Sequence, residues 1–273
     1  MNLNIGRIPF LVCAPFFYNF LTKEGDFPDF LFIDGTPRAH NEALKNNSID
    51  LAPASSITFA KNPELFLLSP KLCTSCHFEV QSVKLFSQKP LLELHHMNIH
   101  LTNQSDTSIA LLEVLLSCRF NVTPTYIRDR AYDPKQDAAR LLIGDQALLE
   151  TNANHFPYSY DLATLWEEWH HLPFVFGAWI IHKNALSKEK KPILDRFLDA
   201  AEENVKSFRR DPQTAIDTWL KKYPIPLPAS MIFSYYDSLD YSFTSERKES
   251  LELFYSLCNQ IGIIPNATKL RFI

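Results

Sequence analysis

Glycine is scarce in this chain, with six glycines among 273 residues. The sequence contains no Gly-x-Gly-x-x-Gly, no Walker loop and no Gly-x-Ser-x-Gly turn, the patterns that surround phosphates with backbone N–H groups or expose a nucleophilic serine. Such turns depend on glycine because the backbone must approach the ligand closely. The composition therefore argues against a phosphate-cradling loop.

Long apolar segments and an excess of basic residues are also missing. No segment is long enough to span a bilayer, and the first residues show no cationic region followed by an apolar stretch and a cleavage site. The formal net charge is -4 and the sequence pI is near 6.1, which gives no general attraction to nucleic acid or to anionic membranes. We expect a cytoplasmic protein whose partner is a small molecule, with no nucleic-acid or membrane partner. The oligomeric state is left open.

Cysteine is limited to five residues, an odd number that favours reduced thiols over a disulfide framework. The segment Cys73-Thr74-Ser75-Cys76-His77 matches the spacing of covalent haem attachment. A zinc site that adds the pair His95-His96 is chemically conceivable, but it lacks the usual second paired spacing. We expect instead a loop whose thiols carry no ligand, and neither a metal nor another cofactor.

The remaining pattern is that of an α/β protein. An apolar run at residues 141–143 ends abruptly in Gly144-Asp145, which predicts an interior strand that delivers a carboxylate to its carboxyl edge, where open α/β sheets bind ligands. The run at residues 172–181 contains no charge before His182 and predicts a second interior strand. With 46% hydrophobic residues, the chain can bury two moderate cores.

Strands and helices are predicted to alternate along most of the chain. Thr36 caps a helix that begins with Pro37, and another helix with Pro15 in its first turn follows the first strand. The predicted strands are 3–12, 30–33, 49–52, 80–87, 99–102, 123–127, 140–143 and 172–182; the predicted helices are 14–21, 37–47, 109–116 and most of 193–261, with a break at 224–228.

This order predicts two lobes. Residues 1–86 and 180–273 form the first lobe, which includes the C-terminal helices, and residues 87–179 form an inserted second lobe. Extended crossovers near residues 82–90 and 172–182 would act as the hinge.

Two helix starts rich in hydroxyl groups are candidate ligand sites. Ser105-Asp106-Thr107-Ser108 and Pro53-Ala54-Ser55-Ser56 each open a predicted helix, where unpaired N–H groups and the helix dipole favour an anion. Ordinary N-capping explains the same residues equally well. Two such corners that face one cleft would suit a ligand with two separated acidic groups.

Asp145 is a candidate base or a group that orients a substrate hydroxyl, although an aspartate after glycine is also a routine turn former. For His170-His171 a surface role is favoured over a metal site, because adjacent residues face different ways on a helix. Trp166, Trp169 and Trp179 are expected in the core or the cleft walls.

Several segments taken together resemble one known family. The chain is similar to the chorismate dehydratases of the futalosine route to menaquinone, in order and without a large gap from about residue 5 to residue 255. The segments that carry this resemblance are Gly6-Arg7-Ile8-Pro9-Phe10-Leu11, Pro53-Ala54-Ser55-Ser56, Ser82-Val83-x-Leu85-Phe86-Ser87, 102–108, 142–148, Tyr160-Asp161-Leu162 and 166–179.

The resemblance implies the two-lobed type II periplasmic-binding-protein fold, with a central cleft between the lobes. It also implies a hydro-lyase that converts chorismate to 3-[(1-carboxyvinyl)oxy]benzoate and water without a cofactor. Carried over by position, Ser82 would bind the leaving hydroxyl, and Ser105, Thr107 and Ser108 would hold a carboxylate. Ser55, Ser56 and Asp145 would line the cleft.

One position departs from the family pattern. Relatives typically have Phe-Leu-Asn-Cys after the first strand, and this chain has Phe10-Leu11-Val12-Cys13. Valine can neither donate nor accept a hydrogen bond, so the contact that the amide makes with substrate is lost at Val12 or made elsewhere. The alternative is therefore a cytosolic binder of a small aromatic or dicarboxylic acid that does not turn it over. The sister enzyme 1,4-dihydroxy-6-naphthoate synthase is a poorer match, because its Ser-Pro-Asp start is absent.

Overall fold

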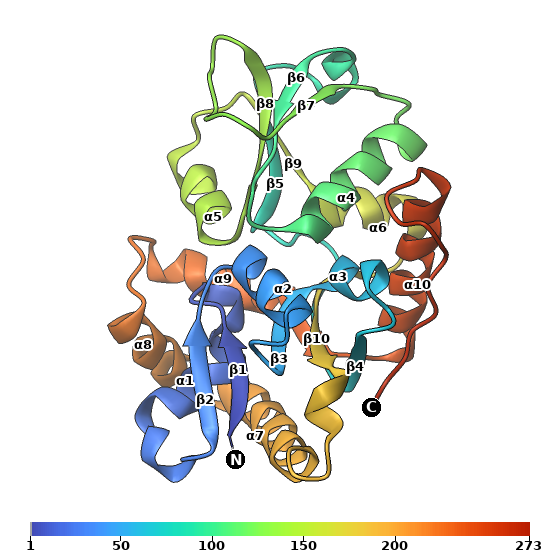
Figure 1. Ribbon diagram of the computed structural model, residues 1–273. Coiled ribbons are helices and arrows are strands. Elements are labelled where there is room, and N and C mark those ends of the chain that lie inside the picture. The colour runs from blue at the N-terminus through green and yellow to red at the C-terminus, as the bar shows by residue number, and fades with distance from the viewer. Residues whose placement is uncertain (1) are drawn as a thin grey trace.

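The chain folds around two β-sheets, one in each of two lobes (Figure 1). The computed structural model describes residues 2–273. The first sheet has the strand order β11-β4-β10-β3-β1-β2, and the second has the order β7-β6-β8-β5-β9. The strands are β1 (Leu3–Arg7), β2 (Phe30–Asp34), β3 (Leu51–Ser55), β4 (Phe66–Cys76), β5 (Val83–Ser87), β6 (Asn98–His100), β7 (Thr125–Ile127), β8 (Asp137–Ile143), β9 (Tyr158–Asp161), β10 (Phe174–His182) and β11 (Leu239–Ser242).

Aromatic side chains fill the core of the first lobe. Strand β1 runs parallel to β2 and β3, and β10 runs antiparallel to β3 and β4. Trp179 of β10 is fully buried, and its ring lies 5.3 Å from Phe16 and 5.2 Å from Phe197. These rings come from α1 (Ala14–Thr22) and α7 (Lys191–Arg210), which pack together with α8 (Pro212–Lys222) in Figure 1. The predicted apolar face of the helix at residues 193–205 is confirmed.

The second sheet is covered by helices from its own lobe. These are α4 (Asp106–Val114), which continues into a π-helical turn at Leu115–Arg119, α5 (Gly144–Ala153) and α6 (Leu162–His170). Strand β5 lies between β8 and β9 and is antiparallel to both. Trp166 of α6 is fully buried. Its indole donates to Ser250 of α10 (Ser245–Gln260) at 3.2 Å, which joins this lobe to the C-terminal helix.

The chain crosses between the lobes twice, through residues 77–82 and 171–173. The hinge predicted near residues 82–90 and 172–182 stays a prediction, and most of both stretches forms interior strands, β5 and β10. Both strands are apolar and largely buried, as is typical of strands that pair with neighbours on both sides inside a sheet. The predicted lobe boundaries, between residues 86 and 87 and between residues 179 and 180, stay a proposal. The strand pairing favours a change of lobe within residues 77–82 and 171–173.

Other differences from the predicted elements have simple causes. The edge strands β9 and β11 were not predicted because they are short and carry polar, partly exposed residues. Cys73 and Cys76 lie in strand β4, so the prediction of a loop there is wrong. Both thiols are buried, and burial raises the pKa of each to about 12. Residues three apart on a strand point to opposite faces, so the two thiols do not form one ligand pair.

No helix in the described part of the chain is long and apolar enough to cross a membrane.

A buried hydroxyl cluster ties the two lobes together behind the cleft. The Oγ1 atom of Thr107, in α4, accepts the N–H of Ile57 at 3.2 Å and lies 3.3 Å from the Oγ of Ser56. Ser56 in turn donates to the carbonyl of Val175 at 2.9 Å. Thr107 therefore caps helix α3 (Ser56–Lys61) of the opposite lobe.

Replacing this inter-lobe cap should destabilise the folded chain. We expect Thr107→Val to lower the free energy of unfolding by about 1 to 2 kcal/mol, because the N–H of Ile57 loses its acceptor inside the protein. Thr107→Ser keeps the oxygen and should recover most of the loss. Chemical denaturation measures both, and equal stability of the valine variant and the wild type would contradict the assignment.

Candidate active site

A cavity lies between the two lobes and has an empty volume of about 650 Å³, part of it open to solvent. Among residues 2–273, no charged side chain lines it. The wall is mostly apolar, and its polar groups are five hydroxyls, those of Ser55, Thr74, Ser82, Ser105 and Ser108. An apolar wall with a few hydroxyl groups suits a small organic ligand, which would be held by shape, hydroxyl groups and backbone N–H groups.

The structure brings five of the eight predicted site residues to this wall, namely Val12, Ser55, Ser82, Ser105 and Ser108. Ser56 and Thr107 do not line it, since their hydroxyls form the inter-lobe cluster described above. Asp145 is also absent from the wall and accepts the N–H of Leu11 at 3.2 Å. Contacts of these three residues with a ligand stay predictions.

The start of α4 presents two hydroxyls from the second lobe. Ser105 is the N-cap, and its Oγ accepts the N–H of Ser108 at 3.2 Å and lies 3.0 Å from the Oγ of Ser108. The capping interpretation of Ser105 is therefore confirmed. Both residues also line the cavity. The same arrangement therefore pairs a free N–H group of the first helical turn and points the positive end of the helix dipole toward the cleft.

Ser82 lies at the end of the first crossover and is buried. Its Oγ accepts a hydrogen bond of 3.1 Å from Tyr235 of α9 (Ala229–Ser238), and its carbonyl accepts the N–H of Gly144 at 2.7 Å. Burial raises the pKa of Tyr235 far above its usual value, so the phenol stays protonated and remains the donor. The proton of Ser82 is thereby free to be donated into the cavity.

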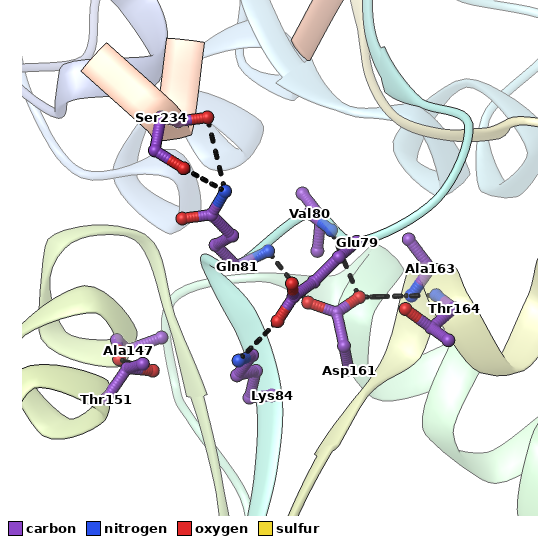
Figure 2. Close-up of polar contacts among 10 residues, drawn as sticks. All are labelled: Glu79, Val80, Gln81, Lys84, Ala147, Thr151, Asp161, Ala163, Thr164 and Ser234. Atoms are coloured by element: carbon purple, nitrogen blue, oxygen red, sulfur yellow. Dashed lines mark hydrogen bonds and ion pairs between the residues drawn. The ribbon is translucent and has the colours of Figure 1, made fainter. Parts of the chain in front are cut away.

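The backbone of this crossover is held by one carboxylate (Figure 2). Asp161 accepts the N–H of Val80 at 3.1 Å and that of Gln81 at 2.7 Å. The same carboxylate caps α6 by accepting the N–H groups of Ala163 and Thr164 at 3.0 and 3.3 Å. Asp161 thus fixes the residues directly before Ser82 to the start of a helix in the second lobe.

The first lobe holds the crossover from the other side. Gln81 has a left-handed backbone, with φ of 61°, and its side-chain amide donates to the carbonyl of Ser234 at 3.2 Å. Ser234 lies in α9 directly before Tyr235. Figure 2 shows its contact with the side chain of Gln81. The buried Lys84 forms an ion pair of 2.8 Å with Glu79 across the same turn. Ser82 is consequently fixed between both lobes.

Val12 faces the cavity from a backbone that is anchored independently of its side chain. The phenol of Tyr241 donates to the carbonyl of Val12 at 3.1 Å, and the phenol of Tyr236 donates to the carbonyl of Leu11 at 2.7 Å. The backbone at position 12 is therefore held by hydrogen bonds that do not involve its side chain, which lines the cavity and packs against the apolar core.

Glycine is favoured at position 144, where the second lobe meets this turn. Its φ is +57°, and a Cβ built there would lie 3.0 Å from the ring of Phe10. Both the backbone conformation and the close approach of this ring disfavour a side chain at this position.

Within the described residues, no group of three or more His, Cys, Asp or Glu side chains could hold a metal ion. Two further residues at the site, Tyr235 and Thr74, carry no signal in the sequence pattern. Tyr235 reaches Ser82 because helix α9, far along the chain, packs against the crossover. Thr74 reaches the cavity because of the register between β4 and β10.

Comparison with known proteins supplies the family. A sequence model described as "Menaquinone biosynthesis" matches residues 3–260. The chorismate dehydratase of Thermus thermophilus is 29% identical over 216 residues, which cover 68% of this chain and 75% of that protein.

Solved structures match the fold. Protein AF1704 of Archaeoglobus fulgidus superposes with a TM-score of 0.75 at 18% identity, over 96% of this chain and 98% of the other. The periplasmic aliphatic sulphonate binding protein SsuA of Escherichia coli gives a TM-score of 0.68 at 16% identity, over 98% and 95% of the two chains. The two-lobed periplasmic-binding-protein fold expected from the sequence is confirmed.

Titration of Asp145 should make stability depend on pH. Burial raises the pKa of Asp145 to about 6, and the N–H of Leu11 offsets part of this effect. Because the pKa is raised in the folded state, the stabilising contribution of the neutral carboxyl is fully present below about pH 4 and is lost as the pH rises through 6.

Asp145→Asn cannot ionise and should remove this dependence, on the order of 2 to 3 kcal/mol between pH 4 and pH 7. The measurement is the free energy of unfolding against pH for the variant and the wild type. Asp237→Asn, at an exposed position of α9, is the matched control. Parallel curves for wild type and Asp145→Asn would refute the assignment.

Proposed function

The chain belongs to the menaquinone biosynthesis family, and from this premise we propose that it is a chorismate dehydratase acting in the cytoplasm. The reaction converts chorismate to 3-[(1-carboxyvinyl)oxy]benzoate and water. The ring hydroxyl leaves, the adjacent ring hydrogen is removed as a proton, and the two combine as water while the ring becomes aromatic. The family match over residues 3–260 and the Thermus relative support this assignment.

The character of the cavity supports a reaction of this kind. Aromatisation provides the driving force, so the protein has mainly to hold chorismate in one orientation and to exclude water. A largely apolar wall with hydroxyl groups and no charged side chain from residues 2–273 is suited to that task. The enolpyruvyl carboxylate of chorismate is itself a base that can take the ring proton, so the cavity wall does not have to supply one.

Ser82 is the residue on which the proposal chiefly depends. Its Oγ already accepts a hydrogen bond from Tyr235, so its own proton is available to the hydroxyl that leaves the ring. Hydrogen bonding to a leaving oxygen is worth most where charge develops and water is excluded. Ser105 and Ser108, at the positive end of α4, would hold one carboxylate of the substrate.

Val12 is the observation that favours a second candidate function. Its side chain lines the cavity at the position where the resembling family has asparagine. Without the amide, the chain could bind a small aromatic or dicarboxylic acid and not convert it.

Incubation of the purified protein with chorismate tests the proposal. We expect an aromatic enolpyruvyl ether to form, detected by chromatography and mass spectrometry. Ser82→Ala should lower kcat by roughly 100-fold, by analogy with removal of a donor to a developing oxyanion. Ser159→Ala, on the exposed edge strand β9, is the control and should leave kcat unchanged.

Absence of product at saturating protein would refute the dehydratase. Chorismate binding measured by calorimetry in the absence of product would then favour the binder.

Restoring the family's amide should increase turnover. We expect Val12→Asn to raise kcat by at least about tenfold, because the backbone at position 12 is already fixed and an amide gained there would reach the cavity. Val12→Leu, similar to asparagine in size but apolar, should give no gain. A lower kcat in Val12→Asn than in the wild type would contradict a defect at this position.

A further inference from the structure

Three residues form a row across the first sheet at the floor of the cavity. Gly177 of β10 is in register with Ser55 of β3 on one side and with Thr74 of β4 on the other. All three residues line the cavity. Side chains of residues directly opposite each other on neighbouring strands share a face of the sheet, so the hydroxyls of Ser55 and Thr74 flank a position that has no side chain.

Gly177 keeps the space between these hydroxyls open. Its φ lies outside the left-handed region, so backbone conformation does not demand glycine here. A Cβ at this position would lie 3.4 Å from the carbonyl oxygen of Ala54 and 3.8 Å from the Oγ1 of Thr74. These are ordinary contacts, so alanine fits the fold, but its methyl group would occupy the gap.

Neither hydroxyl has a structural role of its own. Ser55 is the N-cap of α3, yet it makes no capping hydrogen bond, because Thr107 of the opposite lobe accepts the N–H of Ile57 instead. Thr74 has no side-chain hydrogen-bond partner among the residues that the structure describes. Ser55 and Thr74 are 5% and 8% exposed. Neither hydroxyl oxygen is among the fully enclosed unpaired polar atoms of the described residues, and both residues line the cavity, so both oxygens are open to a ligand there.

We infer that Ser55, Gly177 and Thr74 form a carboxylate subsite. Two hydroxyls on either side of bare backbone can each donate to one oxygen of a carboxylate. Ser105 and Ser108 lie on the part of the wall contributed by the second lobe, so the cavity has two separate hydroxyl pairs for a ligand with two carboxylates. The inference rests on the proposed function for the identity of that ligand as chorismate, but the subsite can be tested without turnover.

The experiment compares a dicarboxylate with a monocarboxylate. Isothermal titration calorimetry measures isophthalate and benzoate binding to the wild type, to Thr74→Val and to Gly177→Ala. The wild type should bind isophthalate more tightly than benzoate. Each variant should weaken isophthalate binding by about tenfold and leave benzoate binding unchanged. Thr74→Val loses one hydrogen bond to a charged group, and the methyl group of Gly177→Ala occupies the space between the two hydroxyls.

Two further variants separate recognition from folding. Thr74→Ser keeps the hydroxyl and should bind isophthalate as the wild type does. Thr58→Val removes a buried threonine hydroxyl of α3 that does not line the cavity, and it should also bind like the wild type. Melting temperatures of all variants show whether each is folded.

The subsite inference is overturned if the wild type binds isophthalate no better than benzoate, or binds neither. It is also overturned if Thr74→Val and Gly177→Ala keep full affinity, or if Thr58→Val loses as much as Thr74→Val. Failure of the proposed function is a separate result, in which the wild type discriminates between the two probes but does not convert chorismate.

Discussion

The buried carboxylate of Asp161 connects the parts of the molecule on which the cleft depends. It accepts four backbone N–H groups, two from the crossover and two from the first turn of α6. A crossover that lacked these acceptors would expose unpaired backbone donors between the lobes, which is costly inside a protein. Because the next residue along the crossover is Ser82, this side chain of the second lobe helps to fix the main candidate catalytic hydroxyl, together with the contacts of Gln81 and Tyr235 to α9.

The two lobes meet through contacts that differ in kind. Thr107 caps a helix of the opposite lobe, Asp145 accepts the N–H of Leu11, and the indole of Trp166 donates to Ser250. The apolar core is also continuous from one lobe to the other. Polar and apolar contacts therefore both hold the lobes against each other, while part of the cavity stays open to solvent. A ligand that fills the cavity would displace water, which strengthens the hydrogen bonds that it makes there.

Sequence patterns predicted several features that burial and local capping decide, but they missed the buried strand β4. Interior strands such as β8 and β10, the cap at Thr36 and the helix start at Ser105 all follow from local residue order. They could not predict the partner of Ser82, because Tyr235 is 153 residues away in the chain. Nor could they show that Thr107 serves the opposite lobe, or that Thr74 and Ser55 are brought to one row by the register of β10. Those features depend on tertiary packing.

The two phenols that grip the carbonyls of Leu11 and Val12 have a consequence for how this protein could diversify. Because these hydrogen bonds reach main-chain carbonyls, they hold the turn whichever side chain stands at position 12. A single codon change there could alter which guest molecules are accepted while leaving the scaffold intact. Homologous proteins that differ at this position could in this way separate into enzymes that convert a small acid and proteins that only bind one.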